Sequence, residues 1–87
     1  MFHVLVSPTA QKQLRKLPLN DGERVRRGLR ALTEDPTTPR VGADIRTLGG
    51  AIRRKFRLRV GPFRIIFAVE GNEVYVYEVF RRGRGYR

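Results

Sequence analysis

Basic residues occupy every odd position from 53 to 59 in the segment RRKFRLRV, residues 53–60. These positions are Arg53, Lys55, Arg57 and Arg59, and the apolar residues Phe56, Leu58 and Val60 alternate with them. Alternation with period two is typical of a strand with one buried and one exposed face. A row of like charges on the exposed face indicates either a binding surface for a polyanion or an ordinary solvated strand. This pattern alone leaves both interpretations open.

A further arginine lies in the next apolar segment, FRIIFAV, residues 63–69. Phe63 and Ile65 share one face of the predicted strand, so Arg64 stands on the other face. If the apolar faces of the two strands coincide, Arg64 joins the cationic row. One side of the sheet would then pack against helices, and the other side would present cations to a ligand.

The net charge of the chain supports a polyanionic partner. Nineteen Lys and Arg against eight Asp and Glu give 19 − 8 = +11, and sixteen of the nineteen cations are arginine. The planar guanidinium group matches phosphate oxygens and stacks on bases better than an ammonium group does. This preference favours RNA or DNA as the partner over a merely solubilising surface charge.

Composition also excludes several classes of protein. The chain has no cysteine and a single histidine, His3, so disulfides, thiolate zinc sites and histidine zinc sites are not expected. We therefore expect neither a metal ion nor another cofactor. No apolar run approaches the roughly 20 residues that cross a membrane, and the first residues lack the basic start of a signal peptide. We expect a cytoplasmic protein without a membrane partner.

The first third of the sequence predicts one strand and two helices. Residues 2–6 form the strand, Ser7 caps the first helix and Pro8 opens it. The second helix runs from a cap at Asn20, with Glu23 completing a capping box, to the stop at Asp35-Pro36. Apolar residues at spacings of three and four give each helix one buried face: Ala10, Leu14 and Leu17 in the first helix, and Val25, Leu29 and Leu32 in the second.

The remaining residues predict a loop and three strands. Residues 36–50 are rich in turn formers, and we expect an ordered loop that Ile45 and Leu48 anchor in the core. Strands are expected at about 52–60, 63–69 and 73–80. The predicted fold is therefore a single α+β domain over residues 1–87, in the order β-α-α-β-β-β. In it an antiparallel helix hairpin packs on one face of an antiparallel sheet.

The sequence resembles the RelE/ParE superfamily of toxins from bacterial type II toxin–antitoxin systems, with the RelE-like branch favoured. The resemblance rests on LGG at 48–50, LRVGPFRIIFAV at 58–69 and the ending VYVYEVFRR followed by Tyr86. It covers nearly the whole chain. It implies a RelE-like fold, a cognate antitoxin as partner, and one of two activities. RelE-like toxins cut messenger RNA on the ribosome without a metal, whereas ParE-like toxins inhibit DNA gyrase.

The resemblance also implies a set of site residues. The catalytic positions of RelE-like toxins fall on Lys55, Arg57, Arg64, Arg82 and Tyr86. Arg53, Arg59, Arg81 and Arg84 are additional candidates for RNA binding. Arg81 stands where many members carry histidine, so the histidine general acid of those relatives is missing.

These residue types suit cleavage of RNA by its own 2′-hydroxyl group. Arg64 and Arg82 would stabilise the charge that develops on the phosphate. Lys55 is the best candidate for a base, because neighbouring arginines disfavour the charged form of a lysine. Arg57 would stabilise or steer a proton, and Tyr86 would act as acid or base or stack on a base. A non-catalytic RNA-binding module remains the third alternative to the nuclease and the gyrase inhibitor.

Overall fold

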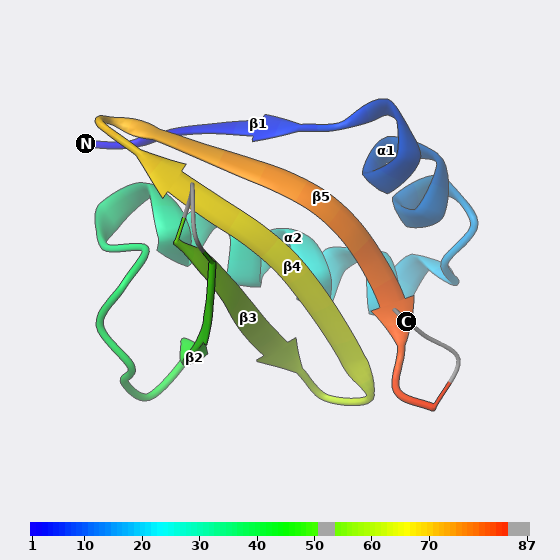
Figure 1. Ribbon diagram of the computed structural model, residues 1–87. Coiled ribbons are helices and arrows are strands. Elements are labelled where there is room, and N and C mark those ends of the chain that lie inside the picture. The colour runs from blue at the N-terminus through cyan, green and yellow to red at the C-terminus, as the bar shows by residue number, and fades with distance from the viewer. Residues whose placement is uncertain (51–53, 84–87) are drawn as a thin grey trace.

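The computed structural model describes residues 1–50 and 54–83 and confirms the predicted α+β class. Along the chain follow β1 (His3–Val6), α1 (Pro8–Arg15), α2 (Leu19–Glu34), β2 (Asp44–Gly49), β3 (Lys55–Val60), β4 (Phe63–Glu70) and β5 (Glu73–Arg81). The five strands form one sheet in the order β1-β5-β4-β3-β2 (Figure 1). The structure thus has one strand more than the sequence predicts.

The additional strand, β2, lies in the segment that was expected to be a loop. It pairs antiparallel with β3, and Ile45 faces Leu58 across the ladder. Ile45 is 3% exposed, which confirms it as a core anchor, but Leu48 is 51% exposed and that prediction is wrong. The reason is a register shift between Thr47 and Gly49, which takes Leu48 out of the regular ladder.

The prediction of a purely antiparallel sheet is wrong, because β1 runs parallel to β5. The two helices and strands β2, β3 and β4 lie between β1 and β5 in the sequence. The chain therefore makes a long connection before β5 returns beside β1. The other three strand pairs are antiparallel. The parallel pair brings the N-terminal strand next to the last strand and leaves β1 and β2 as the two edges.

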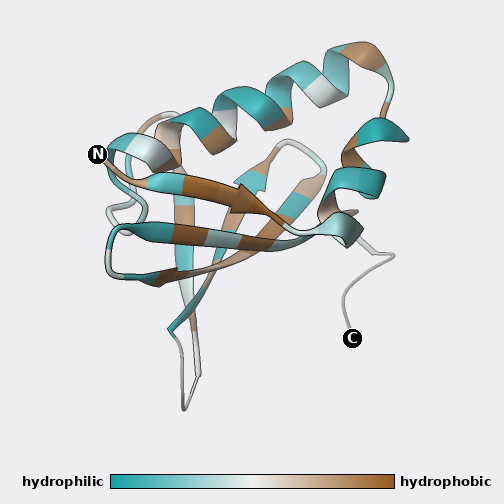
Figure 2. Cartoon of the chain, turned by 90° about the horizontal axis from the view of Figure 1, so that it is seen from above, coloured by the Kyte–Doolittle hydropathy of each residue, from teal (hydrophilic) through white to brown (hydrophobic). Residues whose placement is uncertain are grey.

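Both helices cover one side of the sheet (Figure 2). The predicted helix faces are confirmed for Ala10, Leu14, Val25, Leu29 and Leu32, which are all buried in the core. Leu17, predicted on the face of the first helix, lies beyond the end of α1 and is only partly buried. They pack against apolar side chains of β3, β4 and β5. Two of these are Phe56 and Phe67, whose rings stack at 5.4 Å between centroids. This side of the sheet supplies the hydrophobic core.

The two helices begin differently. Ser7 caps α1 as predicted, because its hydroxyl oxygen accepts a hydrogen bond from the amide of Ala10 at 3.0 Å. The predicted cap at Asn20 is wrong: α2 begins at Leu19, and its cap position, Pro18, provides no side-chain hydrogen bond. Pro18 has an extended backbone, and its carbonyl accepts the amide of Gly22 at 2.9 Å. A proline that is preset for the turn thus replaces the polar cap.

A bulge in β5 is tied to α1. Ile66 pairs with Glu78 and Phe67 with Val76, so the register of the ladder shifts at Tyr77. The hydroxyl of Ser7 donates to the carbonyl of Tyr77 at 2.8 Å, and the side chain of Gln13 accepts the amide of Val79 at 2.6 Å. The cap of α1 and a side chain of α1 thereby satisfy backbone groups of β5 at and beside the bulge.

Among residues 1–50 and 54–83, no helix has the length and apolar character needed to cross a membrane.

Candidate nucleic-acid interface

The sheet face without helices, which we call the outer face, carries the predicted cationic row. Residues directly opposite each other in an antiparallel pair point to the same face. Arg59 lies opposite Arg64 on β4, and Arg57 lies opposite Ile66. On the other side of β3, Arg59 faces Asp44 and Arg57 faces Arg46. Arg64 therefore joins Arg57 and Arg59 on one face, as its position in the sequence predicts.

Four arginines come together where β3 turns into β4. The pKa of Arg64 is lowered, first by its partial burial and then by the charges of Arg59, Arg57 and Arg82. Arg82 reaches this place because its amide donates to the carbonyl of Pro62 in the β3–β4 turn at 2.7 Å. We call these four residues, Arg57, Arg59, Arg64 and Arg82, the arginine cluster. Their mutual repulsion is unfavourable in the free protein, and a bound anion would relieve it.

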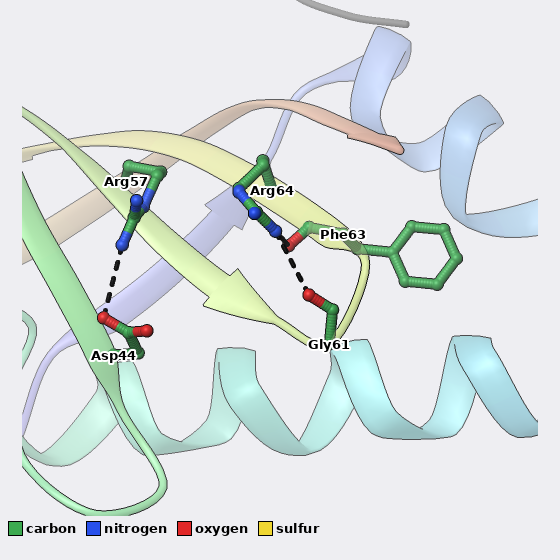
Figure 3. Close-up of polar contacts among 5 residues, drawn as sticks. All are labelled: Asp44, Arg57, Gly61, Phe63 and Arg64. Carbon is green, nitrogen blue, oxygen red and sulfur yellow. Dashed lines mark hydrogen bonds and ion pairs between the residues drawn. The ribbon is translucent and has the colours of Figure 1, made fainter. Parts of the chain in front are cut away.

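Arg64 is held in place by its own strand and turn. One terminal nitrogen of its guanidinium group donates to the carbonyls of Gly61 and Phe63, both at 3.1 Å (Figure 3). Gly61 has a φ of +55°, in the left-handed region that glycine adopts without strain. The turn thus directs its carbonyl at Arg64. A guanidinium group has five N–H donors, so the others remain available for a ligand.

Arg57 is paired with a carboxylate. Its terminal nitrogen lies 3.2 Å from an oxygen of Asp44 on β2 (Figure 3). Its Nε is buried and has no hydrogen-bond partner among the described residues. Buried donors of this kind are rare and indicate either a missing ligand or strain. The Asp44 side chain is 53% exposed, so water screens the pair and it is weak.

Lys55 lies on the outer face but outside the arginine cluster. It is opposite Ala68, four residues before Arg59, which corresponds to roughly 13 Å along the strand at about 3.3 Å per residue. Its ammonium group lies 5.6 Å from the centre of the Tyr77 ring, within the range of a cation–π contact. The β5 bulge thus provides an aromatic neighbour for Lys55.

Arg81 lies on the opposite side of the sheet from the cluster. It pairs with Phe63, whose side chain belongs to the core, and its guanidinium carbon is 5.8 Å from the centre of that ring. The structure therefore does not bring Arg81 together with Arg57, Arg59 and Arg64. The other predicted site residues, Arg53, Arg84 and Tyr86, lie outside the described residues.

The comparison with known families decides the class of protein. A model of the "ParE toxin of type II toxin-antitoxin system, parDE" matches residues 4–86. The chain belongs to this toxin family. No curated protein sequence matches it.

Two solved structures share the fold of this ParE-family toxin. The archaeal RelE–RelB complex from Pyrococcus horikoshii OT3 contains a chain with 25% identity and a TM-score of 0.78. The match covers 97% of the toxin and 98% of that chain. The RelB–RelE complex from Methanococcus jannaschii contains one with 23% identity and a TM-score of 0.72, and 90% of each chain is covered. These findings confirm the resemblance to the RelE/ParE superfamily and the RelE-like fold.

Sequence reasoning missed two of the carboxylates on the outer face of this toxin, Asp44 and Glu78. Asp44 pairs with Arg57, and Glu78 lies opposite Ile66, which is itself opposite Arg57. Alternation around Ile45 in the segment DIRT was the available signal for Asp44, but four residues are too few to distinguish a strand from a loop. Glu78 gave no signal, because the β5 bulge changes which residues face outward.

Proposed function

We propose that this toxin is a metal-free endoribonuclease that cuts messenger RNA on the ribosome. The observation that carries the proposal is the arginine cluster. Residues from β3 and the segment after β5 act together on Arg64 of β4, and neither α1 nor α2 covers the outer face of the sheet (Figure 1). Several guanidinium groups directed at one place suit a phosphodiester group, whose charge increases when the bond is cleaved.

In the proposed reaction the 2′-oxygen of the RNA attacks the adjacent phosphorus and the bond to the 5′-oxygen breaks. The 2′-hydroxyl loses a proton, the leaving 5′-oxygen gains one, and a cyclic 2′,3′-phosphate remains. Arg64 and Arg82 stabilise the negative charge on the phosphate. Arg57 joins them when the phosphate replaces Asp44 as its partner, and its buried Nε gains an acceptor.

Proton transfer has fewer suitable groups at this site than charge stabilisation has. Lys55 remains our candidate for the base and Tyr86 for the acid or a stacking group, while Arg53, Arg59 and Arg84 hold neighbouring phosphates. Arg81 is better placed to pack on Phe63 than to contact the scissile phosphate. Because the proposed site residues include no histidine, the reaction depends on the geometry in which the substrate is held. We therefore assign to the ribosome the task of holding the message in line for attack.

A cognate antitoxin is the proposed protein partner, and the cytoplasm is the proposed location, where ribosomes and messages meet. The related RelE chains are both in complexes with RelB. A chain with a net charge of +11 favours an acidic partner segment over the outer face, where it would compete with RNA.

Inhibition of DNA gyrase is the second candidate, because the matching family model is that of ParE. The arginine cluster argues against it, since a protein that only inhibits another enzyme has no need for clustered cations directed at a phosphate. The plain RNA-binding module, the third alternative, has the same surface but predicts no cutting.

One pair of assays separates these functions. The purified toxin is added to ribosomes translating a defined message, and primer extension maps new ends; gyrase supercoiling is measured in parallel. We expect new ends with the wild-type toxin and undiminished supercoiling. Loss of supercoiling without new ends would instead establish the gyrase inhibitor, and neither effect would leave only binding.

A further inference from the structure

A second basic site lies beside α2, at the ends of β2 and β3. It is a cleft of about 590 Å³, which is within the usual range of ligand pockets. Four arginines contribute to its lining, and we call it the arginine cleft: Arg24, Arg27, Arg40 and Arg59. Asp44 is its one acidic member, so the lining carries a net charge of 4 − 1 = +3.

The arginines of the cleft differ in what holds them. Arg40 has a structural role, because its guanidinium group donates to the carbonyls of Ala31, Asp35 and Thr38 around the end of α2. Arg24, Arg27 and Arg59 have neither an ion pair nor a side-chain hydrogen bond among the described residues. Three guanidinium groups are therefore open to a ligand.

The floor of the cleft depends on a glycine. Gly28 is buried, and a Cβ atom there would lie 2.9 Å from a methyl group of Val60 and 3.1 Å from one of Leu58. This close approach brings α2 against β3. Arg24 and Arg27 lie three positions apart on α2, so their side chains are neighbours beside this floor.

The cleft and the arginine cluster meet at the β3–β4 turn. Arg59 belongs to both sites. A guanidinium nitrogen of Arg24 lies 2.5 Å from the position that a Cβ of Gly61 would occupy, and the carbonyl of the same Gly61 accepts from Arg64. Figure 3 shows this turn between the outer face and α2. Cations are thus continuous from the outer face, around the turn, to the helix side.

We propose that the arginine cleft is a second phosphate-binding site, which holds an RNA backbone phosphate away from the bond that is cut. This assignment rests on the proposed function, because it takes RNA as the ligand of the adjoining cluster. Continuity with the cluster favours RNA over an acidic peptide, since one strand can contact both sites through successive phosphates. Asp44 does not outweigh the arginines, because the lining keeps a net charge of +3 with its carboxylate counted.

The test uses an RNA that the toxin cannot cut, so that binding is measured without chemistry. A fluorescent 12-nucleotide single strand with 2′-O-methyl groups lacks the attacking hydroxyl. Its anisotropy is titrated with the wild-type toxin and with the double variant Arg24→Gln/Arg27→Gln at several salt concentrations. Lys12→Gln/Lys16→Gln, on α1 and at its C-terminal cap, removes two charges as well and is the matched control. All four positions are exposed and glutamine is a good helix former, so thermal unfolding should confirm that both variants fold.

We expect the cleft variant to bind this RNA about tenfold more weakly, or worse, as loss of charge-assisted contacts implies. Its salt slope should fall by about 0.7, the value for one lost phosphate contact on a single strand. The control should lose less than about threefold. Equal losses in the two variants would overturn the proposal, because net charge would then explain both. So would loss of binding to a poly-glutamate peptide with RNA binding unchanged.

Cleavage of a translated message, measured beside binding, keeps the two proposals separate. If the wild-type toxin makes no cut but the cleft variant loses RNA binding as expected, the nuclease proposal fails and the cleft stands. If the wild-type toxin cuts and the cleft variant binds RNA like the control, the cleft proposal fails alone.

Discussion

The two faces of the sheet are built from the same strands and have opposite electrostatics. On the helix side, Phe56, Leu58 and Phe67 are almost completely buried in one core. On the outer face, the residues between them include Arg57 and Arg59, which repel Arg64 rather than stabilise it. The comparison teaches that period-two alternation separates stability from function: one face holds the fold together and the other remains charged for a ligand.

The largest effect should come from the helix side. Phe67→Ala removes a fully buried ring that stacks on Phe56, which should lower the free energy of unfolding by about 3–5 kcal/mol. Urea denaturation followed by circular dichroism measures it. Arg59→Ala, on the outer face, is the control and should change stability by less than about 0.5 kcal/mol. Equal losses at the two positions would contradict the division between the faces.

Substitutions on the outer face should reduce cutting and leave the free energy of unfolding nearly unchanged. Arg64→Ala should slow cutting of a translated message by about 10²–10³-fold, because it removes a donor to the developing charge. Its free energy of unfolding should change by no more than about 1 kcal/mol. Arg15→Ala, an exposed arginine at the end of α1, should cut like the wild-type toxin. Undiminished cutting by Arg64→Ala would remove Arg64 from the site.

A hydrogen bond from β5 to a side chain of α1 lies beside the β5 bulge, and a substitution on α1 tests its contribution to stability. Gln13→Ala leaves the partly buried amide of Val79 without its acceptor, at a cost of about 1–3 kcal/mol. Hydrogen exchange at that amide should become faster. Gln11→Ala is the matched control on the same helix, because its bond to the carbonyl of Val6 is exposed and water can replace it. If the two variants are equally stable, Gln13 does not support the bulge.

Acid should affect the helix side, not the arginine cluster. Hydrogen bonds from the Thr38 side chain and the Thr37 amide, with a smaller one from the Thr38 amide, lower the pKa of Asp35 from 3.8 to about 2. The folded pKa is below the unfolded one, so this carboxylate stabilises the fold above pH 4 and the stabilisation is lost as the pH falls towards 2. Arginines stay charged throughout this range. An NMR titration of Asp35 with a midpoint near 3.8 would contradict the prediction.

Features that depend on strong local patterns could be predicted from the sequence. The helix faces and the shared face of Arg59 and Arg64 follow from spacing over many residues, and the Ser7 cap follows from the pair Ser7-Pro8. The additional strand β2 could not be predicted, because its single inward anchor, Ile45, acquires its role only when β3 is beside it. Pairing partners across the chain determine such elements, and local propensity does not.

The same distinction applies to the candidate site: strand alternation predicts some of its residues, and the pairing and packing of distant elements determine the others. Arg57, Arg59 and Arg64 were placed together correctly because strand alternation fixes their face. Arg81 lies apart from them because it is opposite Phe63, a register that the β4–β5 pairing sets. Asp44 and the arginine cleft were missed, since both depend on where β2 and α2 pack rather than on a motif.

A double-mutant cycle of Arg57 and Arg64 tests most directly whether the arginine cluster grips one phosphate. Cutting rates on a translated message are compared for the wild-type toxin, Arg57→Ala, Arg64→Ala and the double variant. If both guanidinium groups hold the same phosphate, the effects should be non-additive, with a coupling energy of at least about 0.5 kcal/mol. Strictly additive effects on cutting, or no effect of either substitution, would contradict a shared phosphate at this place.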